Sequence, residues 1–306
     1  MRDDQFLMVL PSNSSMRYFP ENRTSSFVTE LPQTVHLHGE WEVALSEIQF
    51  PSTLSHLRYQ ENEIYFFDTK PGEKEAQVAR KGTIWYGLYK NTRELISAIN
   101  ETCKQADSHF YLDQHEQTGG KILISINCNA SECDLIHYMS VSDTLLQILG
   151  LGHALLNIPV YYGELYARRN AINPISKKVF TANYIKLGFF NESKGARETA
   201  FYSREPCSLQ RGIPDKMFVY CDICEPYVTG DVQTPLLRIV PVETYRYNHV
   251  EAYGTNQVKH FSPLHYIPLR KTNFRTIEID IKDQLGKNIP FESGTLTVTL
   301  HFRRFQ

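Results

Sequence analysis

The chain has 306 residues, 42% of them hydrophobic and 22% charged, and a formal net charge of −2. This length suits one large β domain with an insertion, or two domains, and the apolar content is enough for a substantial core. The near-neutral charge argues against a protein that binds nucleic acid through its phosphates, because such proteins carry a basic excess or a basic face. The local basic pair, Arg303 and Arg304, is interpreted as a solvated strand end.

The start of the chain lacks the features of a secretory signal, because Pro11 ends a short apolar run. No stretch approaches the roughly 20 apolar residues of a membrane span. We therefore expect synthesis in the cytoplasm and free thiols at the six cysteines. Five Asn-x-Ser/Thr sequons are interpreted as chance occurrences: Asn13, Asn22, Asn100, Asn129 and Asn191.

The first part of the chain favours strands. Residues 6–10 form a short apolar run, residues 26–31 alternate with a period of two, and residues 40–50 give the clearest alternation. In that last segment alternate residues from Trp41 to Glu47 are predicted to face one side, and those from Glu42 to Ile48 the other. The aromatic run at residues 64–67 is predicted to be a fourth strand, with its rings in the core.

The middle of the chain changes character. Thr92 is predicted to cap a helix that runs to about Ala106, and Ser142 a short helix over residues 144–149 that Gly150 ends. Residues 121–126 and 135–141 are predicted strands between the two helices, which gives a small α+β unit. The stretch from residue 155 to residue 209 has no clear pattern and is interpreted as containing long loops. Within it the Phe189–Phe190 pair is assigned to the core.

Strand patterns return after about residue 212. Four segments are predicted strands: residues 217–223, 236–242, 276–281 and 295–302. Together with the four earlier strands they make the eight antiparallel strands that a jelly roll needs. We therefore expect an all-β fold, a single jelly-roll β-sandwich formed by both chain ends. The predicted boundaries are 1–68 for its first half, 69–211 for an inserted α+β domain, and 212–306 for its second half.

Four ordered groups of segments carry a family resemblance. They are LPSNSS (10–15) with YFPEN (18–22), GEWEVALSEI (39–48), VYCDI (219–223) with PLLRIVP (235–241), and YIPL (266–269) with IEIDI (277–281) and GTLTVTLHFR (294–303). Together they resemble the minor capsid, or penton, proteins of Polinton/Maverick elements and the related adintoviruses. The resemblance spans both chain ends and is weak over roughly residues 60–210.

The resemblance implies a structural virion protein without enzymatic activity. It implies a homopentamer at each five-fold vertex of an icosahedral capsid, next to a double-jelly-roll major capsid protein. The inserted domain would then project outward, where it could contact a host receptor or a fibre. It implies no cofactor, membrane span or specific nucleic acid.

The alternative class is a ligand- or carbohydrate-binding β-sandwich module, because jelly rolls serve both roles. A carbohydrate-binding module would need exposed tryptophan or tyrosine rings. The two tryptophans are Trp41 and Trp85, and Trp41 lies on the apolar face of its strand, which disfavours this alternative.

Candidate metal ligands are few. His36 and His38 could share a strand face, with Glu42 at the spacing of a cupin metal site, which would define a metal-dependent enzyme. Gly39 interrupts the strand between them and no second cupin motif follows, so polar strand-end histidines are the preferred interpretation. Cys221 and Cys224 form a C-x-x-C that could bind zinc with two further thiolates, Cys128 and Cys133.

Opposite-facing strand positions and the absence of a following helix favour buried free thiols at Cys221 and Cys224 instead. Carboxylates near the C-terminal strands could form acid–base pairs, but a solvated sheet face is the simpler interpretation for Asp222, Glu278, Asp280 and Asp283. No nucleophile elbow, phosphate-binding loop or zinc-protease motif occurs. We therefore predict no catalytic, cofactor-binding or metal-binding residues.

Overall fold

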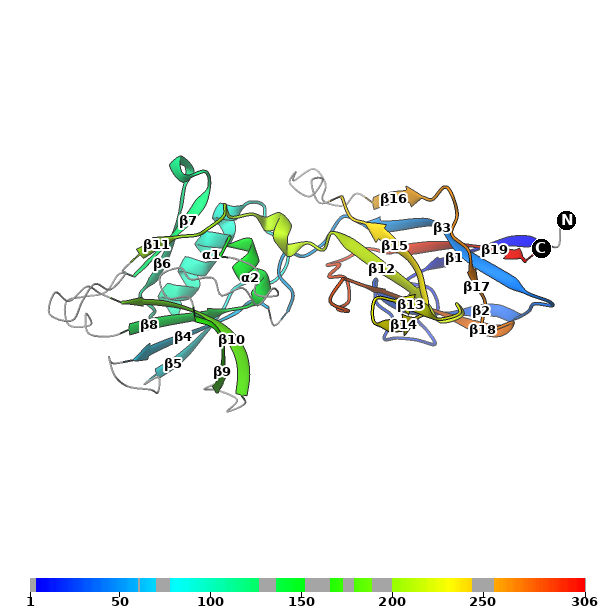
Figure 1. The fold of residues 1–306 in the computed structure, drawn as a ribbon, viewed down its shortest axis with the longest axis horizontal. Coiled ribbons are helices and arrows are strands. Elements are labelled where there is room, and N and C mark those ends of the chain that lie inside the picture. The colour runs from blue at the N-terminus through cyan, green and yellow to red at the C-terminus, as the bar shows by residue number, and fades with distance from the viewer. Residues whose placement is uncertain are drawn as a thin grey trace. The chain divides into compact units, whose positions relative to one another are not determined.

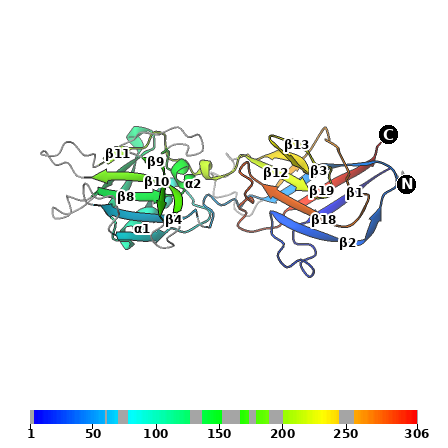
Figure 2. The same ribbon diagram turned by 60° about the horizontal axis from the view of Figure 1, so that its bottom comes forward.

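The computed structural model describes residues 4–59, 61–69, 78–126, 136–151, 166–172, 179–188, 200–243 and 256–305. It divides into two compact units (Figures 1 and 2). The sandwich unit combines Met1–Leu54 with Pro214–Gln306, and the middle unit is Ser55–Ile213. Both ends of the chain therefore fold into one unit, and the middle unit is inserted between them.

Two antiparallel sheets make up the sandwich unit. The first has the order β1 (Gln5–Pro11), β19 (Thr297–Arg304), β3 (Trp41–Pro51), β16 (Asn256–His260), and the short β17 (Ile267–Pro268) also pairs with β3. The second has the order β15 (Leu236–Pro241), β12 (Lys216–Cys221), β18 (Asn273–Lys282), β2 (Ser26–His36). A two-stranded hairpin, β13 (Tyr227–Thr229) with β14 (Val232–Thr234), lies between β12 and β15 in the chain.

The strand order of the two sheets follows one pattern. When the eight longer strands of this unit are numbered in chain order, the sheets run 1-8-3-6 and 2-7-4-5. This order is that of two interleaved Greek keys in a jelly roll. Phe274 of β18 and Phe302 of β19 stack across the sheets with ring centroids 6.2 Å apart, so the two inner faces share one core. The predicted all-β fold is confirmed.

The register of β3 differs from the prediction. A bulge at Ser46 lets β19 pair Thr299 with Glu47 and Leu300 with Leu45, and the Ser46 hydroxyl donates to the Thr299 carbonyl at 2.9 Å. An extra residue shifts the alternation by one. Ile48 and Phe50 are therefore buried, while Glu47 is only partly buried. The prediction that Glu47 continues the apolar face was wrong.

The division of strands between the units also differs from the prediction. Residues 64–67 lie in β4 (Glu63–Thr69), which pairs with β5 and β8 of the middle unit. The structure places the first boundary after Leu54 rather than at residue 68. The strand that completes the set of eight is instead β16, which was not predicted. It is a polar strand at the edge of its sheet, with alternate residues exposed, so it lacks an apolar pattern.

The described residues of the middle unit form two sheets and two α-helices. One sheet has the order β5 (Val78–Thr83), β4, β8 (Ile136–Val141), β10 (Val179–Gly188), β9 (Tyr166–Ile172), and the other β11 (Ala200–Tyr202), β7 (Lys121–Ile126), β6 (Phe110–His115). The helices are α1 (Thr92–Gln105), α2 (Asp143–Ile148) and the 3-10 turns η1 (Glu116–Thr118) and η4 (Leu209–Gly212). Three of these strands, β9 to β11, fall where the sequence analysis expected long loops.

Both predicted helices are present, with small changes at their ends. Asn91, not Thr92, caps α1, since its side chain accepts a hydrogen bond from the Glu94 N–H. The buried face of α1 includes Leu95, Ile96, Ile99 and Cys103, as its periodicity predicts. Ser142 caps α2 as predicted, and Gly150 follows it with a φ of +73°. The strand β6 between the helices was missed, and Phe189–Phe190 lie outside the described residues.

Candidate functional site

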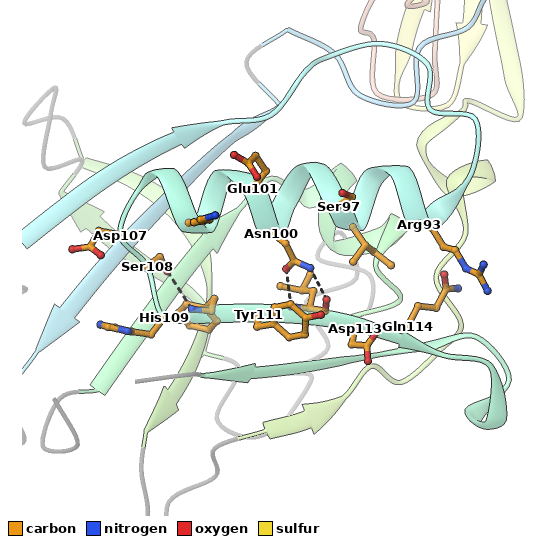
Figure 3. A pocket seen from close by; sticks show the side chains of 14 residues that line it. Arg93, Ser97, Asn100, Glu101, Asp107, Ser108, His109, Tyr111, Asp113 and Gln114 are labelled. Carbon is orange, nitrogen blue, oxygen red and sulfur yellow. Dashed lines mark hydrogen bonds between the residues drawn. The ribbon is translucent and has the colours of Figure 1, made fainter. Parts of the chain in front are cut away.

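A groove of about 660 Å³ lies between α1 and β6 in the middle unit (Figure 3). Its rim is mostly polar, with Arg93, Ser97, Glu101 and Lys104 from the helix and His109, Tyr111 and Asp113 from the strand side. The volume is in the range of ligand pockets, but the surrounding side chains mix both signs of charge and include few apolar groups.

Asn100 forms the centre of this groove. Its amide donates to the Leu112 carbonyl at 2.8 Å and accepts from the Leu112 N–H at 2.9 Å, which satisfies the free edge of β6 (Figure 3). Thr92 donates to the Gln114 side chain at 2.8 Å, and His115 lies 3.4 Å from Asp113. Asn100 and Thr92 therefore join the helix to the edge of β6, whereas His115 and Asp113 both lie on that strand. Asn100 is also a sequon residue whose amide is already engaged.

The cupin-like residues do not converge. His36 ends β2 and is exposed, His38 lies in the following loop, and the His38 carbonyl accepts from Trp41 Nε1 at 3.1 Å. Glu42 is buried in β3, where one carboxylate oxygen accepts from Nε and Nη2 of Arg303, both at 2.9 Å. Among the residues that the structure describes, no three His, Cys, Asp or Glu side chains could hold a metal together.

Arg303 is more than a solvated strand end. Besides its bond to Glu42, its guanidinium lies 3.5 Å from the centroid of the Tyr266 ring. The Tyr266 hydroxyl in turn hydrogen-bonds His301 Nδ1 at 2.9 Å. These contacts hold the segment before β17 against the outer face of the first sheet, which explains why both faces of β3 are buried near Glu42. Arg304 is exposed, in agreement with the prediction for it.

The carboxylates of the C-terminal strands have structural partners. Asp222 Oδ1 accepts from the Glu278 N–H at 2.8 Å, and Asp283 Oδ1 accepts from the N–H groups of Leu285 and Lys287 at 2.8 and 2.9 Å. Asp280 pairs with Lys282 at 2.9 Å, and Glu278 is exposed. Asp222 therefore joins the end of β12 to β18, Asp283 closes a turn, and Asp280 pairs on the strand surface.

Cys221 and Cys224 are both fully buried free thiols at the end of β12, and Cys128 and Cys133 lie outside the described residues. A hydrogen bond with Cys221, together with burial, raises the pKa of Cys224. Burial also raises the pKa values of Cys103 and Cys207 to about 12. Because the thiolate is the reactive form, Cys103, Cys207 and Cys224 are expected to be inert, and full burial shields the Cys221 thiol from reagents.

We expect the four described cysteines to remain unmodified when native protein is treated with iodoacetamide at pH 8. Peptide mapping by mass spectrometry gives the readout, and the same treatment in denaturant should alkylate all four. Rapid alkylation of Cys221 or Cys224 in the native protein would contradict the burial described above.

His56 is a buried histidine of the middle unit. Its Nδ1 accepts from the Tyr89 N–H at 3.0 Å, and burial lowers its pKa from 6.5 to about 4. The folded state therefore favours the neutral ring, which accepts this bond. Stability from this group is fully present above pH 6.5 and is lost as the pH falls from 6.5 towards 4.

We expect the middle unit to lose about 3 kcal/mol of stability over that pH range through His56 alone. Hydrogen exchange followed by mass spectrometry, compared between pH 7 and pH 4.5, measures the opening of peptides around residues 55–62 and 84–89. In His56→Gln, which keeps an acceptor but does not titrate in this range, the pH dependence of those peptides should be much weaker. An unchanged slope in the variant would assign the effect to other groups.

Exposed aromatic residues gather at one place in the middle unit. Trp85 is 58% exposed, the rings of Tyr59 and Tyr86 meet edge to face at 5.6 Å, and Trp85 meets Tyr89 at 5.7 Å. Trp41, by contrast, is buried in the sandwich unit as its strand pattern predicts. This cluster was not predicted, although the aromatic composition of residues 84–89 could have indicated it.

Two further exposed surfaces lie on the sandwich unit. The loop between β1 and β2, residues 12–25, exposes Met16, Arg17 and Tyr18, and the β13–β14 hairpin exposes Tyr227, Val228 and Val232. Clustered exposed apolar and aromatic side chains mark interaction surfaces. In the described part of the chain, no helix is long and apolar enough to cross a membrane.

Comparisons with known proteins give similarities to solved structures. No sequence-defined protein family matches the chain, and no curated protein matches it. The chain is similar to the mavirus penton protein, at 11% identity over 98% of this chain and 99% of that chain, with a TM-score of 0.44. It is also similar to a chain of the Sputnik virophage structure from cryo-electron microscopy, at 11% identity over 98% of both chains, with a TM-score of 0.41.

Proposed function

We propose that this protein is a non-enzymatic structural component of a virion, a penton-type minor capsid protein. Five copies would form a ring at each five-fold vertex of an icosahedral capsid and contact a double-jelly-roll major capsid protein. The protein would be made in the host cytoplasm and reside in the virion. The domain roles follow: the sandwich unit builds the shell, and the middle unit projects from it as a site for a receptor or a fibre.

One observation carries this proposal. All four groups of segments that resemble penton proteins of Polinton/Maverick elements and adintoviruses lie in the sandwich unit, on strands β1, β3, β12, β15, β17, β18 and β19 or in adjacent loops. These strands have the jelly-roll order 1-8-3-6 and 2-7-4-5. Because jelly rolls serve several functions, the fold alone would not select a capsid role, and the order of family-like segments supplies the selection.

The side-chain chemistry agrees with a structural role. Of the candidate acid–base residues, Asp222 binds a backbone N–H of β18 and Asp283 holds a turn, and Glu42 forms an ion pair with Arg303. Exposed apolar side chains lie on both units, and those of the sandwich unit include Met16 and Tyr18 in the loop before β2 and Val228 and Val232 in the β13–β14 hairpin, where they could contact other subunits. A structural protein acts through such contact surfaces rather than through a catalytic cluster.

We expect the purified full-length protein to assemble into rings with five times the 35.4-kDa chain mass. Native mass spectrometry measures the subunit number, and negative-stain electron microscopy should show five-fold particles. A protein that remains monomeric at high concentration, alone and with the major capsid protein, would contradict the proposal. Another closed subunit number would retain a shell role and exclude the penton assignment.

A ligand-binding module remains the second candidate, and the exposed Trp85 favours it for the middle unit. Tryptophan and tyrosine rings present flat apolar faces that can stack on sugar rings, and Tyr59 and Tyr86 lie beside each other. A glycan array probed with the full-length protein tests this role. Binding that is lost in Trp85→Ala, with subunit number unchanged, would support it, and absence of glycan binding would remove it.

A further inference from the structure

The loop of residues 12–25, here called the anchor loop, exposes side chains typical of binding hot spots. Met16 is 43% and Tyr18 63% exposed, and Arg17 between them is also exposed. Methionine, arginine and tyrosine are enriched at protein interfaces, and tyrosine and arginine are over-represented among hot-spot residues. Among the described residues, the Arg17 guanidinium has no hydrogen-bond or ion-pair partner.

Hydrogen bonds hold the anchor loop in one conformation. Asn22 donates to the carbonyls of Ser14 and Val28 at 3.1 and 2.9 Å and accepts from the Val28 N–H at 2.9 Å. The Ser15 hydroxyl accepts from the Glu30 N–H at 2.9 Å, and Thr24 donates to the Gly294 carbonyl at 2.9 Å. A surface that is already ordered loses little entropy on binding, which favours a contact site.

The β13–β14 hairpin has complementary chemistry. Val228 and Val232 are 67% and 53% exposed, and Glu225 and Asp231 are exposed as well. Residues 225–234 contain these two carboxylates and no lysine or arginine, whereas the anchor loop contains Arg17, Arg23 and one acid, Glu21. Within the described ranges, the Asp231 carboxylate has no partner. An isolated hairpin of this size is only marginally stable in water, so a covering partner would stabilise it.

The two surfaces lie at opposite sides of the same unit. The anchor loop leads into β2, one edge of the sheet β15-β12-β18-β2, and the hairpin leads into β15, the other edge. Figure 2 shows the hairpin at the upper side of the sandwich unit and the loop that precedes β2 at its lower side. Two complementary surfaces at different places on one subunit produce a head-to-tail contact, and such contacts form a ring when the rotation between copies closes.

We propose that the anchor loop of one copy binds the β13–β14 hairpin of the next copy and thereby forms the ring contact. The occupant of each surface is a second copy of this chain. Arg17 pairs with the acidic hairpin, and Met16 and Tyr18 cover Val228 and Val232. This inference rests on the proposed function, because it names the contact through which the subunits of the ring would associate.

Charge reversal across the contact tests the inference in the full-length protein. Arg17→Glu and Asp231→Lys, made singly, should each raise the subunit concentration needed for half-assembly at least about 10-fold. The double variant should return it to within about 3-fold of the wild type, since the charges are restored with opposite signs. Analytical ultracentrifugation over a concentration series measures the assembly. Arg304→Glu and Asp215→Lys, which reverse exposed charges elsewhere on the same unit, are the matched controls.

The outcomes separate this inference from the proposed function. If the wild type forms rings and both single reversals assemble like the controls, the contact lies elsewhere and the inference is wrong while the penton role stands. If both singles and the double variant fail to assemble although their circular dichroism is native, pairing between the two surfaces is also contradicted. If the wild type forms no ring under any condition, the proposed function itself fails.

Discussion

Replacing Phe302 with alanine is expected to destabilise the sandwich unit by about 4 kcal/mol and to prevent assembly. Phe302 is fully buried in β19, where its ring stacks on Phe6 of β1 at 4.7 Å and faces Phe274 of β18 at 6.2 Å. It therefore joins the first strand of the chain, the last strand and the opposite sheet. Truncation leaves a cavity at the point where both chain ends meet, and tightly paired strands cannot collapse to fill it.

Trp41 provides the readout for this variant. Its ring lies 5.6 Å from Phe6, and in a Trp85→Phe background it is the remaining tryptophan. Urea titration followed by its fluorescence then reports the sandwich unit alone. Phe305→Ala is the control, because Phe305 lies three positions later and is 57% exposed. A loss below about 1 kcal/mol for Phe302→Ala would contradict the shared core of the two chain ends.

Replacing Gly150 with alanine is expected to cost the middle unit at least about 3 kcal/mol. Gly150 follows α2 with a φ of +73°, a conformation in which L side chains are strained. A β carbon at this position would also lie 2.2 Å from the Glu205 carbonyl oxygen, whose peptide closes over the helix end. The Glu205 N–H donates to the Gly150 carbonyl at 3.1 Å, so the two segments cannot separate without losing that bond.

Gly119→Ala separates the two causes of this effect. Gly119 lies in the same unit with nearly the same φ, +70°, but a β carbon there meets nothing within 4 Å. We expect it to cost about 1 kcal/mol, from backbone strain alone. Hydrogen exchange of peptides around α2 and residues 203–207 measures both variants. Equal losses for Gly119→Ala and Gly150→Ala would show that the close approach of Glu205 is unimportant.

Local sequence signals predicted the elements better than their pairing. The alternation in β18 and β19 and the caps of α1 and α2 follow from neighbouring residues, so the sequence analysis located these elements to within a few positions. The bulge at Ser46 depends on the partner strand β19, some 250 residues away, and no local pattern encodes it. The strand signal at residues 64–67 was correct, but such a signal does not say which sheet receives the strand.

The candidate surfaces were harder to predict than the elements. Residues of the anchor loop were recognised only as part of a family-like segment, because a loop pattern does not reveal that Asn22 ties the loop to Ser14 and Val28. The hairpin was missed, since its strands have only three residues each. The burial of Cys221 and Cys224 agrees with the expectation, but the geometry behind it was wrong. A turn after β12 brings Cys224 back to Cys221, and the two side chains hydrogen-bond instead of facing opposite sides of a strand.

The pairing of β1 with β19 has a consequence for synthesis on the ribosome. Residues Gln5 to Pro11 find their partners only at Thr297 to Arg303, so this strand emerges long before the strand that completes it. At a translation rate of about 5–20 residues per second, β19 is synthesised roughly 15 to 60 seconds after β1. The strands of the middle unit pair only within residues 55–213 in the described structure, so that unit can fold during the delay. A chain that terminates before β19 cannot close the sandwich, so incomplete products would leave β1 without its partner strand.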